Sequence, residues 1–287
     1  MIDRIEASGP NADQIRYWDE ISGPKWVRLG DRIDRQIAPI GLEAIDAAHI
    51  RSGERVIDVG CGCGQTTLEL ARRVGPEGHV LGVDISSPML ADAQRRIDEA
   101  GLEQAEVLCG DAQTMDRPEA DLVFSRFGVM FFADPVAAFR NLRRALRPGG
   151  RLVFLCWQRP EKNPWIQVPT AAAAIHVPPP EPPAPDKPGP FALANPDRLR
   201  EILETAELAS IEIDPLERAL DVAGGESLDE TVEFLSQMGP TAALLREAEE
   251  ATRKAAKRSV RDALLPYQRD GRIELGSACW RVRAGRE

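Results

Sequence analysis

The amino-acid sequence predicts an α/β protein built around a doubly wound, mostly parallel β-sheet. Over residues 51–158, short continuous apolar runs alternate with segments of helical periodicity, which is the pattern of strands covered by helices on both faces. The apolar run at 56–59 leads directly into three glycines at every second position, and a helix-like segment follows at once. This strand, loop and helix form the most informative unit of the sequence.

The segment before this unit, residues 11–50, reads as helical. Ile33, Ile37, Ile40 and Ala44 recur at helical spacing. Pro39 lies among them, and because proline lacks a backbone N–H, we expect it to kink or divide the helix.

Five strands are expected in the first part of the sheet, at residues 56–59, 80–83, 106–109, 121–125 and 151–157. Ser86 or Ser87 is expected to cap the helix after the second strand, and Gly101 ends that helix. Asp134 begins the helix before the fifth strand. Connections of this kind make the five strands parallel.

The pattern changes after Trp157. The proline-rich residues 177–190 are expected to form an extended loop. A linker between independent domains is the alternative, but the segments that follow read as more of the same sheet. They are a helix from Asn195 to about Ala206, a strand at 211–213, a helical lid at 227–265 and a final strand at 277–282.

The composition argues against several kinds of partner. The net charge of −10 disfavours nucleic acid and anionic membrane surfaces, and no apolar run reaches the roughly 20 residues that span a bilayer. The first residues lack the basic and apolar regions of a signal peptide, so we expect a cytoplasmic location. The five cysteines include no CxxC pair, so no metal site is expected. We interpret these cysteines as small side chains that suit a tight loop and the ends of strands. The alternative is that their thiols hold a substrate.

The glycine loop points to one kind of ligand. Gly60, Gly62 and Gly64 let a ligand approach the backbone, and the helix N-terminus behind them offers unpaired N–H groups to a carboxylate. Asp58 would repel a pyrophosphate but attract an amino group. Gln65 stands where a dinucleotide-binding GxGxxG loop has its third glycine. These features favour a nucleoside that bears an amino acid.

Four motifs in order give the chain a resemblance to the class I S-adenosylmethionine-dependent methyltransferases. They lie at residues 56–64, 80–89, 110–113 and 146–154. The resemblance implies a Rossmann-like sheet of seven strands with the last strand antiparallel, S-adenosylmethionine as cofactor, and methyl transfer to a small molecule. The bacterial ubiquinone and menaquinone biosynthesis methyltransferases are the group that the chain resembles most by inspection.

This resemblance divides the chain into three parts. Residues 1–50 are expected to form an N-terminal helical cover, and residues 51–158 the cofactor-binding core. Residues 159–287 are expected to supply a lid insertion and the C-terminal strands that complete the same domain. The expected partner is a small-molecule substrate, without nucleic acid or membrane, and the chain is expected to be a monomer or a homodimer.

The resemblance also implies roles for individual residues. Asp84 is expected to accept hydrogen bonds from both ribose hydroxyls, with helix capping as the alternative. Asp111 is expected to accept from the adenine amino group, with a turn-capping role as the alternative, and Met89 packs either on the adenine or in the core. The expected cofactor-binding residues are Asp58, Gly60, Gly62, Gly64, Asp84, Ile85, Met89, Asp111, Ala112, Ser125, Arg126 and Trp26.

Methyl transfer from a sulfonium is an in-line displacement that depends on alignment and on exclusion of water. A general base is optional, which leaves two candidate catalytic residues. Arg126 either orients an anionic substrate or pairs with Asp58 or Asp111, and His176 is either a base or an exposed loop histidine. The candidate residues of the acceptor pocket are Tyr17, Trp18, Phe131, Trp157, Trp165, Phe234 and Met238.

Two other functions remain open from the sequence. A non-catalytic module that binds S-adenosylmethionine or S-adenosylhomocysteine would show the same glycine and carboxylate positions. An NAD-dependent oxidoreductase is disfavoured by Gln65 and by Asp58.

Overall fold

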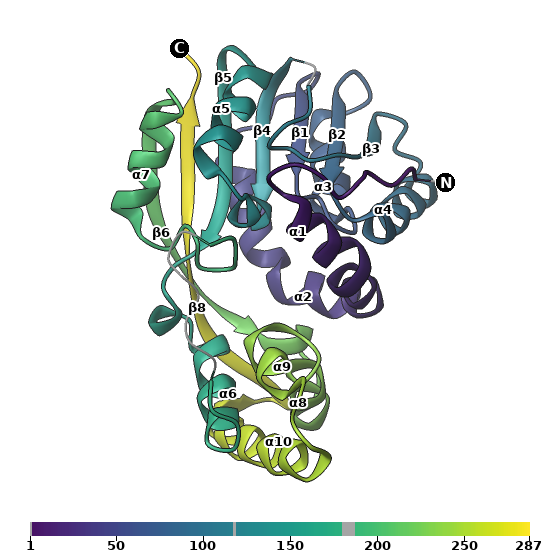
Figure 1. Cartoon of the computed structure of the whole chain (residues 1–287). Helices are drawn as coiled ribbons and strands as arrows, with labels where there is room; N and C mark the ends of the chain where they lie inside the picture. The colour runs from purple at the N-terminus through teal and green to yellow at the C-terminus, as the bar shows by residue number, and fades with distance from the viewer. Residues whose placement is uncertain (1, 117–118, 180–186) are drawn as a thin grey trace.

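The computed structural model describes residues 2–116, 119–179 and 187–287. Figure 1 shows a twisted sheet with helices against it, from which a smaller, mostly helical part extends on two long strands. The strands are β1 (Arg55–Val59), β2 (His79–Asp84), β3 (Ala105–Cys109), β4 (Ala120–Arg126), β5 (Leu146–Trp157), β6 (Ala209–Asp221), β7 (Gln268–Arg269) and β8 (Arg272–Gly285).

The sheet confirms the expected fold class. Its strands lie in the order β3-β2-β1-β4-β5-β8-β6, and the short β7 pairs with β8 outside this path. The strands from β3 to β5 pair in parallel, whereas β8 is antiparallel to both of its neighbours. The carboxyl ends of β1, β2 and β4 therefore meet at one edge of the sheet, the edge at which parallel α/β sheets bind ligands.

Two strands are much longer than the sequence suggested. The expected strand at 211–213 lies near the start of β6, and the one at 277–282 lies in the middle of β8. These two strands stay paired as far as Asp221 and Glu274. Many residues of β6 are exposed and charged, so the apolar alternation that marks a strand is weak there. The extra length of the two strands supports the smaller part of the molecule.

The N-terminal segment is helical, as expected, but Pro39 does not divide it. It consists of α1 (Ala12–Arg16), the π-helix η1 (Tyr17–Ser22) and α2 (Gly23–Ala47), and Pro39 lies inside α2. An internal proline costs about 3 kcal/mol, whereas full burial of one large aliphatic side chain contributes roughly 1.5–3 kcal/mol. Because α2 buries Ile33, Ile37 and Ile40 in the core, its packing outweighs the proline.

The helices that flank the sheet begin and end close to the predicted residues. They are α3 (Gln65–Val74), α4 (Ser87–Ala100), α5 (Pro135–Ala145) and α7 (Pro196–Thr205), with the short η2 (Gly128–Phe131) and η3 (Pro160–Lys162). The side chain of Asp134 caps α5 by accepting from the backbone N–H of Ala137. Ser86 occupies the N-cap position of α4, as expected, but its side chain does not cap the helix, because its Oγ donates to the backbone oxygen of Trp18 instead. The backbone N–H of Ser87 donates to Asp19 of η1, so the N-terminal segment supplies this cap.

The smaller part, which we call the lid, includes the segment at 227–265 that was expected to be helical. It contains α6 (Pro164–Ala174), η4 (Val222–Gly224), α8 (Leu228–Leu235), α9 (Gly239–Leu245), α10 (Glu250–Leu264) and η5 (Leu265–Tyr267). Figure 1 shows these helices gathered around the far ends of β6 and β8. The expected proline-rich loop at 177–190 lies partly outside the described residues.

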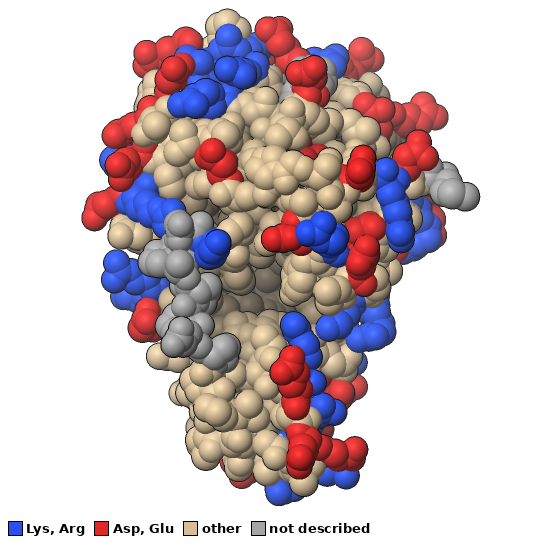
Figure 2. Space-filling model, in the orientation of Figure 1, with Lys and Arg blue, Asp and Glu red and all other residues tan. Residues whose placement is uncertain are grey.

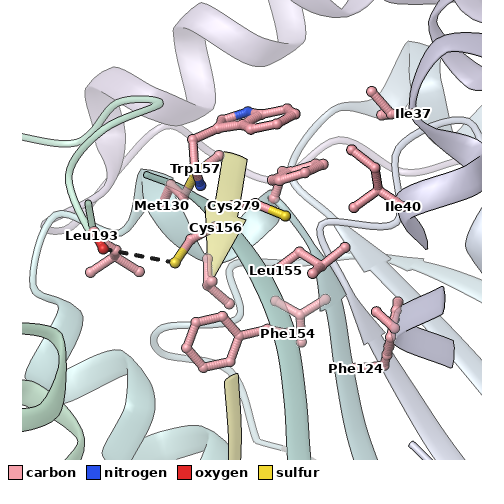
Figure 3. Packing of buried hydrophobic residues seen from close by; sticks show 14 of the residues in the cluster. Ile37, Ile40, Phe124, Met130, Phe154, Leu155, Cys156, Trp157, Leu193 and Cys279 are labelled. Carbon is pink, nitrogen blue, oxygen red and sulfur yellow. Dashed lines mark hydrogen bonds between the residues drawn. The ribbon is translucent and has the colours of Figure 1, made fainter. Parts of the chain in front are cut away.

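The apolar core lies on both faces of the sheet. Phe124, Phe154 and Ile40 are fully buried, and Figure 3 shows the first two on neighbouring strands with Ile40 of α2 to one side. Cys156 belongs to the same cluster, and its Sγ lies 3.8 Å from the backbone oxygen of Leu193. All five cysteines carry free thiols.

Candidate functional site

A cavity of about 250 Å³ lies between the carboxyl ends of β1, β2 and β4 and the lid. Figure 2 shows it as a hollow between the two parts of the molecule, with uncharged atoms around its floor. Residues of α2, the glycine loop, η2, α6, α8 and α9 also line it. The cavity therefore has one end at the sheet edge and another under the lid.

The glycine loop forms part of the sheet end, and its backbone requires glycine. Gly60, Gly62 and Gly64 have φ values of +67°, +58° and +82°, which L side chains rarely adopt. A Cβ on Gly60 would lie 2.6 Å from the Cα of Gly128, the residue that begins η2. Gly60 and Gly62 line the cavity, whereas Gly64 packs behind the loop against Ala93 of α4.

Asp58 lies beneath this loop and does not reach the cavity wall. The hydroxyls of Thr66 and Thr67 both donate to its Oδ2 at 2.7 Å, while Oδ1 is buried without a hydrogen-bond partner in the part of the chain that the structure describes. Burial raises the pKa of Asp58 to about 6, against the hydrogen bonds of the two threonines. An orphaned carboxylate oxygen at this place suits a cationic ligand above the loop.

Asp84 lies on the cavity wall at the end of β2. Its Oδ2 accepts from the backbone N–H of Gly62 and its Oδ1 from that of Ser86, each at 2.9 Å. Burial raises the pKa of this carboxyl, and the backbone donors oppose the rise. Each oxygen keeps acceptor capacity for a ligand. Ile85 and Met89 line the cavity beside it, so the structure brings these three candidates together.

Asp111 and Ala112 line the same end of the cavity. Asp111 Oδ1 accepts from the side-chain amide of Asn11 at 3.0 Å and from the backbone N–H of Gln113 at 2.9 Å. Asn11 is buried, lines the cavity and also accepts from the backbone N–H of Ala133. The N-terminal segment is thus tied to the third strand's loop through Asn11, a residue that the sequence did not single out.

Arg126 ends β4 on the cavity wall, while Ser125 lies behind it. Ser125 is fully buried and donates to the backbone oxygen of Val59 at 2.7 Å. The ion pair that the structure gives Arg126 is with neither Asp58 nor Asp111, the partners of one of the two alternatives, although the charge of Asp58 also acts on Arg126. Its guanidinium contacts Asp34 of α2 at 3.3 Å and donates to Gln65 at the start of α3. Burial lowers the pKa of Arg126, and the charge of Asp34 opposes this shift.

The lid end of the cavity is aromatic and apolar. Trp157 stacks on Phe127 with ring centres 4.1 Å apart, and Trp165 lies 5.2 Å from Trp157. Trp18 packs edge-on against Trp26 and Phe131. The candidates that line the cavity are Trp157, Trp165, Phe234 and Met238, together with Trp18 and Trp26 of the N-terminal helices and Phe131 of η2.

Two candidates lie elsewhere. Tyr17 is 37% exposed and is not part of the cavity wall. His176 follows α6 on the lid surface, where its Nε2 lies 2.8 Å from Ser259 Oγ, and it does not line the cavity either. Conversely, Asp34 and Phe127 are on the wall, and no sequence signal marks them, because Asp34 occurs in a charged helix and Phe127 in an apolar run.

Known proteins resemble the chain most strongly over the segment that builds this site. A family described as "Methyltransferase domain" matches residues 56–150. A demethylmenaquinone methyltransferase of Listeria welshimeri is 33% identical over 128 residues, which are 44% of this chain and 54% of that protein. An aklanonic acid methyltransferase of a Streptomyces species is 36% identical over 143 residues, or 49% of this chain and 64% of that protein. The chain thus spans about half to two thirds of the length of these relatives.

A solved structure supports the fold over most of the chain. The YcgJ protein of Bacillus subtilis superposes with a TM-score of 0.56 and 18% identity, covering 86% of this chain and 97% of that one. The sequence match and the strand order agree with the four motifs around the glycine loop. Residues 56–150 therefore resemble a methyltransferase domain, and the fold around them agrees with that resemblance.

Proposed function

We propose that this protein transfers the methyl group of S-adenosylmethionine to a small-molecule acceptor. One observation carries the proposal: the glycine loop, Asp84 and Asp111 meet at the sheet end of a cavity whose other end is closed by an apolar lid. The polar end suits a nucleoside that bears an amino acid, and the apolar end suits an organic acceptor.

The residues at the sheet end fit the cofactor in detail. Asp84 would accept from the ribose hydroxyls, Asp111 from the adenine amino group, and Ile85 and Met89 would pack on the adenine. The N-terminus of α3 would face the methionine carboxylate, and the negative charge of Asp58 beneath the loop would favour the ammonium and the sulfonium.

The residues at the lid end would align the acceptor and exclude water. Bound S-adenosylmethionine supplies a methyl group on positively charged sulfur, which a nucleophile displaces in line. Trp18, Trp26 and Phe131 would shield this step from solvent, and an aromatic face also attracts a cation. Alignment and a dry site supply most of the acceleration in such a reaction.

This proposal also includes the division of the chain into three parts at residues 50 and 158. It further includes a cytoplasmic location and a monomeric or homodimeric state. No described helix is long and apolar enough to cross a bilayer.

The direct test is turnover with labelled cofactor. The protein is incubated with methyl-labelled S-adenosylmethionine and a panel of aromatic and polyketide-like acids, phenols and amines. Acceptor-dependent formation of S-adenosylhomocysteine supports the proposal. Tight cofactor binding without transfer to any acceptor would favour a binding module instead.

Replacing Trp26 with alanine should weaken cofactor binding roughly tenfold, because removal of a large aromatic wall costs on the order of 1–2 kcal/mol. The measurement is the Kd of S-adenosylhomocysteine by calorimetry. Tyr17→Ala is the matched control, since Tyr17 lies in the same segment but off the cavity wall. If both variants bind like the wild type, the N-terminal segment does not cover the cofactor.

Replacing Asp58 with asparagine should change how stability depends on pH. The pKa of Asp58 is raised from 3.8 to about 6 in the folded protein, so the carboxyl favours folding while it is protonated. That contribution is complete below about pH 4 and is lost as the pH rises through 6, by on the order of 3 kcal/mol. Urea unfolding at pH 4 and pH 7.5 should show a larger loss for the wild type than for Asp58→Asn. The same loss in both proteins would mean that Asp58 keeps an ordinary pKa.

A further inference from the structure

The described residues of the cavity wall are mostly apolar, and the charged side chains among them are acidic apart from one. Among the described residues that line it, the only cationic side chain is that of Arg126. Its side chain is 9% exposed, so its charge is largely removed from water. A buried guanidinium is stable only when anions or acceptors surround it.

The resident partners of Arg126 compensate it only in part. Asp34 contacts it at 3.3 Å but lies closer, at 2.7 Å, to Arg96 of α4. One carboxylate is thus shared between two arginines. Gln65 is neutral. A guanidinium has five N–H donors in a planar fork that matches a carboxylate. The contacts of Arg126 with Asp34 and Gln65 do not use all five donors.

Among the described residues, the wall also offers no base left over for an acceptor, because the proposed cofactor contacts use Asp84 and Asp111. Its titratable side chains are Asp34, Asp84, Asp111, Cys61, Cys63 and Arg126. Asp34 is held by two arginines. Burial raises the pKa of Cys63 to about 12 and also raises the pKa of Cys61 well above its ordinary value. No histidine, lysine, glutamate or tyrosine is among the described lining residues. An acceptor that is already an anion at neutral pH needs no such base.

The surroundings of Arg126 define the rest of the acceptor. Phe127, the next residue, has a left-handed φ of +66°, a backbone strain that a structure retains mainly at functional sites. In this conformation its ring stacks on Trp157, which borders Trp165 of the lid. The cation and the aromatic wall are therefore supplied by consecutive residues at the end of β4.

We propose that the acceptor is an apolar, ring-bearing organic acid whose carboxylate or ionised enol is bound by Arg126. This rests on the proposed methyl transfer at the same site. In the transfer, a lone pair of the anion forms the new bond to the methyl carbon as the sulfur–carbon bond breaks. The electrons of that bond stay on sulfur, which becomes neutral, and no proton moves. Arg126 is then a specificity-determining residue that selects an anion in an apolar pocket.

Equilibrium dialysis at pH 7.5 with saturating S-adenosylhomocysteine tests this with two probes of one shape. 2-Naphthoate carries the anion, and 2-naphthalenemethanol is its neutral counterpart. The wild type should bind naphthoate at least tenfold more tightly than the alcohol. Equal affinities, or no binding of naphthoate, would overturn the proposal, while failure to bind S-adenosylhomocysteine itself would overturn the proposed function.

Three variants assign the preference to Arg126. Arg126→Gln should abolish it. Arg96→Gln lies off the cavity wall and leaves Asp34 to Arg126 alone, so it should weaken naphthoate binding but keep the preference. Asp34→Asn frees the guanidinium and should strengthen naphthoate binding, so the proposal is testable even if Arg126→Gln folds poorly. If Arg126→Gln weakens only S-adenosylhomocysteine and the naphthoate preference persists, Arg126 binds the cofactor carboxylate and the proposal is wrong.

Discussion

Replacing Asp84 with alanine should weaken binding of S-adenosylhomocysteine about thirtyfold or more. Charge-assisted hydrogen bonds to ribose hydroxyls contribute on the order of 2 kcal/mol. The same carboxylate also holds the glycine loop, because it accepts from the backbone N–H of Gly62. The substitution therefore removes a ligand contact and the brace that shapes the loop. Calorimetric titration gives the Kd directly.

Two further variants separate these effects. Asp84→Asn keeps one acceptor oxygen, so its Kd should fall between those of the wild type and Asp84→Ala. Asp98→Ala removes an exposed carboxylate of α4 that bonds only to Gln94, and its Kd should equal that of the wild type. An unchanged Kd for a folded Asp84→Ala protein would remove Asp84 from the cofactor site.

Replacing Gly60 with alanine should cause the largest loss of stability among the loop variants. At φ +67° an L side chain costs roughly 1–2 kcal/mol. A Cβ there would also lie 2.6 Å from the Cα of Gly128, so β1 and the turn after β4 would have to separate. We expect a decrease of about 3 kcal/mol or more in the free energy of unfolding, together with loss of cofactor binding.

Gly101 provides the matched control for this substitution. It has a similar φ of +63°, but nothing lies within 4 Å of a Cβ placed on it. Gly101→Ala should therefore show the backbone strain alone, about 1 kcal/mol, with cofactor binding intact. Urea unfolding of both variants measures the difference, and equal losses would show that the contact between Gly60 and Gly128 is unimportant.

The sheet was predictable because its signals are local. The apolar runs of β1, β2, β4 and β5 stand out against charged helices, and the glycines after β1 mark the turn. Even so, the limits of β6 and β8 were not predictable, since their lengths depend on pairing with each other across the intervening residues 222–271 rather than on local apolar alternation.

The site residues that follow a strand of the sheet were predictable from the sequence. Those contributed by segments outside the sheet were not. Asp84, Asp111 and Arg126 each end or follow a strand, so topology alone brings them to one edge. Asn11 and Asp34 reach the cavity only because the N-terminal helices fold across it. Tyr17 and His176 resemble site residues by chemistry, but tertiary packing places them off the wall.

The central claim is that the glycine loop binds S-adenosylmethionine, and titration of the wild-type protein with its product tests this most directly. Calorimetry should show micromolar binding of S-adenosylhomocysteine with one site per chain, and no binding of NAD⁺ under the same conditions. Binding of NAD⁺ in place of S-adenosylhomocysteine would contradict the claim.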